Sequence, residues 1–155
     1  MKKIIGLCIL LLCLACNEDE SFDPTIMPEI TLTGEKTFGC LVDGWLYSSG
    51  RWGTPKATHK IKEDNTYVEI VAPIEHMGTS EFIDHSSYIR LTLVNPKKGE
   101  TVIYTDAVFE GEKLENGKAN ILRMDNGIIS GTFEGTRMTN GRFDLKYLEE
   151  EEQKE

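Results

Sequence analysis

The densest group of side chains that could bind a metal ion or transfer protons lies between residues 75 and 85. Two histidines and three carboxylates fall in this segment, namely Glu75, His76, Glu81, Asp84 and His85. Imidazole nitrogens and carboxylate oxygens are ligands that zinc and other transition metals accept. Their spacing, however, matches no compact metal motif such as two histidines four positions apart on a helix. We therefore predict a solvated loop without a metal or other cofactor, and the sequence alone leaves metal binding by this group open.

Hydrolytic chemistry would need a nucleophile next to a histidine and an orienting acid, or two carboxylates facing one cleft. The chain has three histidines and no Gly-x-Ser-x-Gly motif that would present a serine nucleophile. It has 26 acidic residues, and their spacing singles out no pair. The sequence therefore favours a protein that is not an enzyme, and a hydrolase acting on glycans or peptides is the first alternative.

Cys40 lies in a strand pattern that ends at a predicted hairpin turn, Asp43-Gly44. An Asp-Gly pair favours a two-residue type I′ turn, which places Cys40 opposite Tyr47. The same turn places Val42 opposite Trp45. We expect all four side chains on the core face of the sheet, because residues two apart in a strand share a face. Cys40 is then a buried small hydrophobic residue rather than a reactive thiol.

Trp52 is the aromatic residue that this hairpin does not assign to the core. It lies beside Arg51 in a segment rich in serine and glycine, which is typical of a loop. The high average burial of tryptophan favours a ring folded back over the end of the sheet. In the other interpretation the ring projects from the loop, and Trp52 with Arg51 is a candidate contact for a glycan or a protein partner.

The elements that must position these side chains are β strands. Apolar and polar residues alternate over 66–72, 87–94 and 142–147, and no window of about a dozen residues has helical periodicity. Turn signals separate the strand patterns at Asp43-Gly44, Pro96–Gly99, Asn116-Gly117, Asn126-Gly127 and Asn140-Gly141. We predict an all-β domain over 37–148, an antiparallel meander of about eight to ten strands that forms a sandwich or a flattened barrel.

Two of these turn signals make specific predictions about strand connections. Asn116-Gly117 is expected to fold a strand over 107–115 onto a strand over 118–124. Asn140-Gly141 is expected to lead into the last strand, over 142–147.

The amino terminus has the pattern of a secretory signal. Lys2 and Lys3 precede an apolar run over 4–15, which at twelve residues is shorter than the roughly 20 that a membrane-spanning helix needs. Cys16 follows Ala15, the kind of small residue that a signal peptidase requires before its cleavage site. We therefore predict that residues 1–15 are removed.

The segment Leu14-Ala15-Cys16 resembles the bacterial lipobox, although Cys13 stands where that motif usually has leucine. The resemblance implies a diacylglyceryl thioether and an amide-linked acyl chain, such as palmitate, on Cys16. Two or three acyl chains hold a protein on a membrane essentially permanently. The acidic residues that follow, 17–20, resemble the export tag of Bacteroidota surface lipoproteins, which implies an outer-membrane location at the cell surface.

The mature chain is predicted to have three parts. Residues 16–36 are acidic and contain two prolines, so we expect a lipidated flexible tether. The β domain over 37–148 follows, and residues 149–155 form an acidic tail.

The net charge argues against a nucleic acid partner, and the cysteine content argues against an intramolecular disulfide. Loss of residues 1–15 removes Lys2 and Lys3 and changes the formal net charge from −9 to −11. Because this field repels polyanions, we expect no nucleic acid partner. Acylation of Cys16 leaves Cys40 as the last thiol, so no intramolecular disulfide can form.

The segments 37–44, 129–133 and 140–147 resemble small Bacteroidota lipoproteins built around a domain of unknown function. The resemblance covers most of the mature chain and implies no particular activity. We predict a cell-envelope lipoprotein that acts as a non-catalytic binding or accessory module at the outer membrane, with a glycan or a protein as its ligand. The alternatives are a hydrolase and a structural component of an envelope assembly that makes contact through strand edges.

Overall fold

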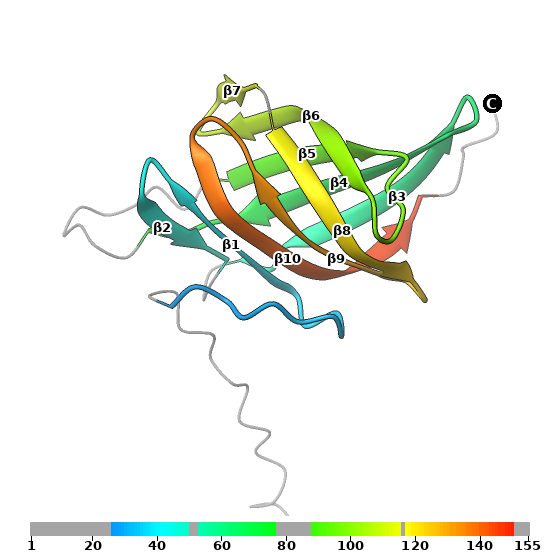
Figure 1. The fold of residues 1–155 in the computed structure, drawn as a ribbon, viewed down its shortest axis with the longest axis horizontal. Helices are drawn as coiled ribbons and strands as arrows, with labels where there is room; N and C mark the ends of the chain where they lie inside the picture. Colours follow the sequence, from blue (N-terminus) through cyan, green and yellow to red (C-terminus); the bar gives the residue numbers. More distant parts are fainter. Residues whose placement is uncertain (1–25, 50–52, 77–87, 116, 151–155) are drawn as a thin grey trace, which may run out of the picture.

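The computed structural model describes residues 26–49, 53–76, 88–115 and 117–150 of the 155-residue chain. These residues form ten strands and no helix (Figure 1). The strands are β1 (Thr37–Val42), β2 (Trp45–Ser48), β3 (Lys56–Lys62), β4 (Asn65–Pro73), β5 (Tyr88–Val94), β6 (Thr101–Phe109), β7 (Glu112–Leu114), β8 (Gly117–Asp125), β9 (Ile128–Glu134) and β10 (Met138–Glu149). The predicted all-β class and the predicted number of strands are confirmed.

Seven of the strands close into a flattened barrel in the order β10, β3, β4, β5, β6, β8, β9, and back to β10. Neighbours in the barrel are antiparallel except β10 and β3, which are parallel. The long strand β10 makes closure possible, because its first half pairs with β1 and its last three residues pair with β3. The β1–β2 hairpin therefore lies outside the closed ring, beside β10, and β7 folds back on the end of β6 (Figure 1).

The apolar side chains of the alternating sequence patterns fill the interior of the barrel. The side chains assigned to the core in β4 and β5 are fully buried: Val68, Ile70, Ala72, Ile89, Leu91 and Leu93. Phe38 and Phe133 stack in the centre with their ring centroids 5.2 Å apart. Cys40 is a free, fully buried thiol among these residues, as predicted, and its burial raises its pKa to about 12.

The hairpin at Asp43-Gly44 has the predicted register, with Cys40 opposite Tyr47 and Val42 opposite Trp45. Both turn residues have positive φ, 50° for Asp43 and 86° for Gly44, as a type I′ turn requires. The prediction that Trp45 belongs to the core was nevertheless wrong, because its side chain is 60% exposed. Since β2 lies outside the closed ring, the core-side face of its first residue is not enclosed by the barrel.

The prediction that Asn140-Gly141 forms a turn was also wrong, because this pair lies inside β10. Gly39 of β1 pairs with Arg142 and Leu41 pairs with Thr139, so β10 carries one extra residue, a β-bulge. Asn140 has a φ of 53° there, a conformation that asparagine tolerates better than most residues. The chain turns instead at residues 135–137, between β9 and β10.

The predicted strand over 107–115 does not exist as one element. The chain turns at Glu110-Gly111, where both residues have positive φ, and β7 then runs back along β6. Strand β8 begins at Gly117 and pairs with the other half of β6. Asn116 lies outside the described residues. A Glu-Gly pair is a weaker hairpin signal than Asn-Gly, which is why the sequence pointed to the later position.

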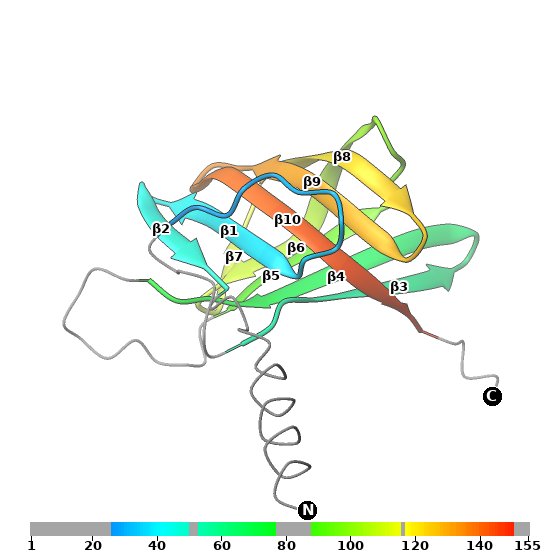
Figure 2. The same ribbon diagram turned by 90° about the horizontal axis from the view of Figure 1, so that it is seen from below.

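The chain before β1 does not behave as a free tether over its whole predicted length. Residues 26–36, which we call the arm, cross the outside of β1 and β10 (Figure 2). Pro28 is buried against Gly39, and the carbonyl oxygen of Pro28 accepts a hydrogen bond of 2.6 Å from Arg142. Contacts with β1 and β10 therefore begin by Pro28, ahead of the boundary expected at residue 36.

Asp144 holds the arm to the barrel. This carboxylate is only 1% exposed, although it points to the outer face of β10. It accepts hydrogen bonds from Ser130 Oγ of β9, from Thr31 Oγ1 at 2.7 Å, and from the backbone nitrogens of Thr33 at 3.0 Å, Gly34 at 2.9 Å and Glu35 at 3.2 Å. Burial alone would raise the pKa of Asp144, but these hydrogen bonds outweigh it and lower the pKa below the usual value.

Candidate functional site

Most of the residues predicted from the sequence to form a site lie outside the described residues. This applies to the acylation site Cys16, to the candidate ligand contacts Arg51 and Trp52, and to Glu81, Asp84 and His85 of the polar group. Of that polar group, the structure describes Glu75 and His76, which follow the end of β4. Apart from His76, the candidate site therefore consists of residues that the sequence did not predict to form a site.

His76 belongs to a row of aromatic side chains. Its Nδ1 lies 2.9 Å from the carbonyl oxygen of Leu46, which fixes the ring beside β2. The ring stacks on Tyr47 with centroids 5.0 Å apart and meets Trp45 edge-on at 5.3 Å. In the described part of the chain, no three His, Cys, Asp or Glu side chains are placed to share a metal ion.

The aromatic row is formed by Trp45, His76, Tyr47 and Phe109, and it runs from solvent toward the core. Phe109 is buried and makes an edge-on contact with Tyr47 at 5.2 Å. Trp45 ends the row with a largely exposed indole. Aromatic pairs of this geometry are attractive beyond the area they bury, so the row holds the exposed indole in a defined orientation.

Arg137 connects the aromatic row to the turns at the same end of the barrel. Its guanidinium contacts Asp43 Oδ2 and Glu112 Oε2, each at 2.6 Å, and lies 5.8 Å from the centre of the Phe109 ring. Its carbonyl oxygen accepts a hydrogen bond from the backbone nitrogen of Asp43 at 3.0 Å. The hydrogen bond from Arg137 lowers the pKa of the Asp43 carboxyl. Three turns of the barrel are thus held together by one cation.

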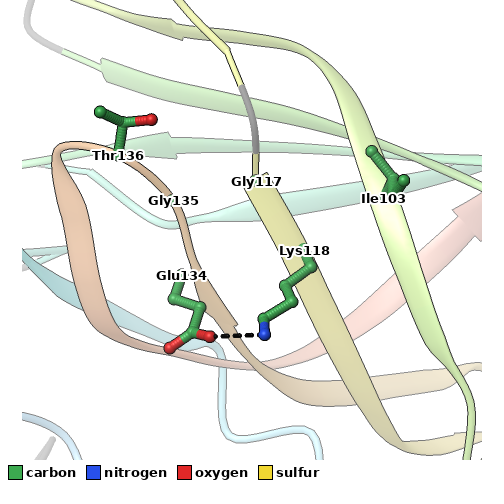
Figure 3. A pocket seen from close by; sticks show the side chains of 6 residues that line it. All are labelled: Ile103, Gly117, Lys118, Glu134, Gly135 and Thr136. Carbon is green, nitrogen blue, oxygen red and sulfur yellow. Dashed lines mark ion pairs between the residues drawn. The ribbon is translucent and has the colours of Figure 1, made fainter.

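A pocket of about 530 Å³ opens on the other side of the β9–β10 turn. Figure 3 shows its lining: Ile103 from β6, Gly117 and Lys118 from β8, Glu134 from β9, and Gly135 and Thr136 from the turn. Lys118 Nζ and Glu134 Oε1 are 3.0 Å apart and form an ion pair across one side. The pocket therefore offers a cation, an anion, a hydroxyl group and the apolar side chain of Ile103 within one small area.

Two glycines let the ring of Tyr104 support this pocket from inside the barrel. A Cβ atom on Gly117 would lie 1.5 Å from the ring, and one on Gly135 would lie 2.3 Å from the hydroxyl oxygen. That hydroxyl donates a hydrogen bond to the carbonyl oxygen of Glu134 at 3.1 Å. Burial raises the pKa of Tyr104 to about 12, so the phenol stays protonated as a donor.

The pocket and the aromatic row meet at the turn over residues 135–137, and together they form what we call the barrel-end surface. Thr136 lines the pocket, whereas the next residue, Arg137, contacts the row. The sequence offered one signal for this surface. The hairpin predicted at Asp43-Gly44 correctly paired Trp45 with Val42. The contribution of Arg137 and the pocket had no local signal, because they depend on strands that are distant in the chain.

Each of the two histidines among the described residues has Nδ1 in contact with a neighbouring oxygen. His59 Nδ1 contacts Glu149 Oε2, and His76 Nδ1 contacts a backbone carbonyl. Ser130 and Asp144 form a buried serine–carboxylate contact, and Asp144 also accepts a hydrogen bond from the backbone of the arm. The barrel-end surface combines an exposed indole, suited to stacking, with polar groups that can form hydrogen bonds.

No protein-family model matches the chain, and neither does any of the curated proteins or solved structures with which it was compared. Within the described residues, no helix has the length and apolar character needed to cross a bilayer. Any statement about function must therefore be argued from the residues and their geometry.

Proposed function

We propose that the chain is a lipoprotein of a bacterial cell envelope, anchored through acyl chains on Cys16, and that its barrel is a non-catalytic binding module. In this proposal the lipobox-like segment before Cys16 directs the protein to the membrane and the acidic residues 17–20 direct it to the outer surface. The proposed ligand is a glycan, bound at the barrel-end surface.

The observation that carries the binding proposal is the position of Trp45. An indole that is 60% exposed, yet oriented by His76 and Tyr47, is a ready platform for stacking. Tryptophan is strongly enriched among residues that dominate binding energy.

The pocket beside the β9–β10 turn offers polar groups that suit a glycan. Its lining combines the Lys118–Glu134 ion pair with the hydroxyl group of Thr136, and it has one large apolar side chain, Ile103. Hydroxyl groups of a sugar can both donate to a carboxylate and accept from an ammonium group. A protein ligand is the competing outcome of the test below.

The test is a binding screen of residues 17–155 against a glycan array and, in parallel, a peptide library. We expect a glycan to bind, and Trp45→Ala to weaken that binding about tenfold or more, because stacking on the indole is lost. Leu148→Ala is the matched control, since Leu148 is 70% exposed near the end of strand β10 and lies outside the barrel-end surface.

Binding of peptides alone would replace the glycan with a protein ligand. Unchanged glycan affinity of the Trp45→Ala protein would remove the barrel-end surface from the proposal. Release of a cleaved product from any bound glycan or peptide would favour the hydrolase alternative instead.

The alternative of a structural component would use free strand edges for assembly. In the part of the chain that the structure describes, β2 has four residues and β7 has three. The end of β2 is further occupied by a bridge between Ser48 and Glu75. Edges this short offer little backbone for pairing with a second protein, so the observations favour binding through side chains.

A further inference from the structure

The arm carries three large apolar side chains that are exposed to solvent. Thr31 points inward, because its hydroxyl group donates to Asp144. Its neighbours Ile30 and Leu32 are 53% and 42% exposed, and Ile26 at the start of the arm is 63% exposed.

The barrel beneath the arm holds these side chains in fixed positions. Arg142 donates to the carbonyl oxygen of Pro28, and Arg123 donates to that of Leu32. Ile30 lines a hollow over β8, β9 and β10 together with Asn120 and Thr132. Leu122, which is 38% exposed on the outer face of β8, adds a further apolar side chain next to Arg123. We call Ile26, Ile30, Leu32 and Leu122 the arm face.

The length of chain before the arm limits how far this face can lie from the proposed anchor. Ten residue steps separate Cys16 from Ile26. Fully extended, they span at most about 36 Å, and a flexible chain of this length has a mean reach of about 17 Å. Even the fully extended length is only slightly greater than that of a single long strand such as β4, about 30 Å. A protein anchored at Cys16 must keep the start of its arm near the bilayer.

Charge indicates what kind of surface the arm face could meet. The mature chain carries a formal net charge of −11, and the arm itself has the exposed carboxylates Glu29 and Glu35. Anionic lipid headgroups repel this charge, so attraction to a lipid surface has to come from the apolar side chains of the arm face. Exposed isoleucine and leucine side chains gain free energy when they enter the boundary of the acyl chains.

We propose that the arm face is the side of the barrel that rests on the lipid surface, with Ile26, Ile30 and Leu32 in contact with the acyl boundary. This inference rests on the proposed anchoring at Cys16. The anchor supplies the binding energy, and the arm face selects one orientation of the barrel among those that the anchor permits. The Asp144 contacts make that orientation a property of the whole barrel rather than of the arm alone.

The test uses the lipidated full-length mature protein in phosphatidylcholine vesicles that contain a membrane-depth quencher. A fluorophore is attached to a single introduced cysteine in separate variants: Ile30→Cys, Leu32→Cys, Ile61→Cys and Ile103→Cys. Native thiols do not interfere, because Cys40 is fully buried and the Cys16 sulfur is consumed by its thioether. Ile61 and Ile103 are matched controls, being 57% and 73% exposed on β3 and β6.

We expect labels at Ile30 and Leu32 to be quenched at least about twofold more than labels at Ile61 and Ile103. Equal quenching at all four positions in protein that floats with the vesicles would overturn the orientation and leave the anchoring intact. Protein that fails to float with the vesicles would overturn the anchoring, and the orientation with it.

A second variant tests whether the arm orients the barrel. Asp144→Ala removes the acceptor that holds residues 31–35. A label at Leu122→Cys, on the barrel, should be quenched more than the control labels when Asp144 is present and should lose most of that excess in the Asp144→Ala background. A label at Ile30→Cys, on the arm, should keep its excess quenching in both. Retention of both signals in folded protein would show that the arm does not set the orientation, which contradicts the proposal.

Discussion

Asp144 shows how a single acidic residue can acquire a structural role that its local sequence does not reveal. In the sequence it is one of the polar positions of an alternating strand, and the outer face of a barrel strand is normally solvated. The arm covers it, and the donors of the arm replace water. Several hydrogen bonds compensate a buried carboxylate for its lost hydration, so removing one partner lowers the free energy of unfolding considerably.

Replacing Asp144 should therefore destabilise the protein. We expect Asp144→Asn to lower the free energy of unfolding by about 2 to 3 kcal/mol, because the amide group is uncharged and presents a donor to the backbone nitrogens of the arm. Urea unfolding at neutral pH measures this change. Asp64→Asn is the control, since Asp64 is exposed in the β3–β4 turn at a φ of 64°, which asparagine also tolerates. A loss no larger than that of the control would contradict the role of Asp144.

The same residue should make stability depend on pH. Its folded-state pKa lies below the ordinary value of 3.8, so the unfolded chain binds more protons when the pH is near or below that value. The stabilisation is complete above the unfolded pKa and is lost as the pH falls through the folded pKa. Between about pH 5 and pH 2, the free energy of unfolding should fall more steeply in the natural protein than in Asp144→Asn. Parallel slopes in denaturant unfolding over this range would count against the assignment.

Cys40 should be chemically silent in the folded protein. Its thiol is fully buried and its pKa is raised to about 12, so almost no thiolate exists at neutral pH. A thiol reagent added to residues 17–155 should react only as fast as the barrel unfolds, and at full speed in denaturant. Rapid reaction in native conditions would mean that the thiol is accessible.

At the scale of elements, three strands meet around Tyr104. Strand β6 supplies the ring, and β8 and β9 approach it through Gly117 and the neighbouring Gly135. This close approach explains why glycine occurs at both positions, and it also forms one side of the pocket of the barrel-end surface. The sequence indicates neither contact, because glycine in a strand has several possible reasons.

We expect Gly117→Ala to destabilise the protein by about 1 to 3 kcal/mol, because the added methyl group overlaps the Tyr104 ring and forces it or the strand to move. A double-mutant cycle with Tyr104→Ala provides the control. In the Tyr104→Ala background the same substitution should cost much less, since the ring that it overlaps is gone. Equal costs in both backgrounds, measured by urea unfolding, would place the conflict elsewhere.

At the scale of the whole molecule, closure of the barrel decides which surfaces are left for function. The ring removes most strand edges, and the β1–β2 hairpin is left outside it. This is why the side chain of Trp45 is exposed to solvent, although Trp45 pairs with Val42 as predicted. The arm then covers one outer side, so the barrel-end surface and the arm face are separate consequences of one topology.

The proposed anchoring makes a prediction about the location of the protein. Cys16→Ala should move it from the membrane fraction to the soluble fraction in a bacterial host that processes lipoproteins, because the acyl chains supply the membrane affinity. Cell fractionation measures the distribution, and mass spectrometry of the natural protein should find acyl chains at its first residue. An unmodified terminus, or membrane retention of the Cys16→Ala protein, would contradict the anchoring.

Much of the fold could be predicted from the sequence because its signals are local. Alternation with a period of two identified β4, β5 and the end of β10, and the turns at Asp43-Gly44 and Asn126-Gly127 lie where the sequence places them. The turn predicted at Asn140-Gly141 failed for a physical reason, since Asn140 has a φ of 53° within a β-bulge. An Asn-Gly pair indicates backbone with positive φ, and such backbone occurs in bulges as well as in turns.

The sequence by itself determined the all-β class, the apolar face of each main strand and the burial of Cys40, since each follows from side-chain alternation over a few residues. Tertiary structure alone decided that the sheet closes, that Trp45 is exposed, and that Asp144 is buried under residues 31–35. Those features depend on contacts between segments that are up to 113 positions apart. Such contacts form only when the whole chain has folded, so no local pattern can specify them.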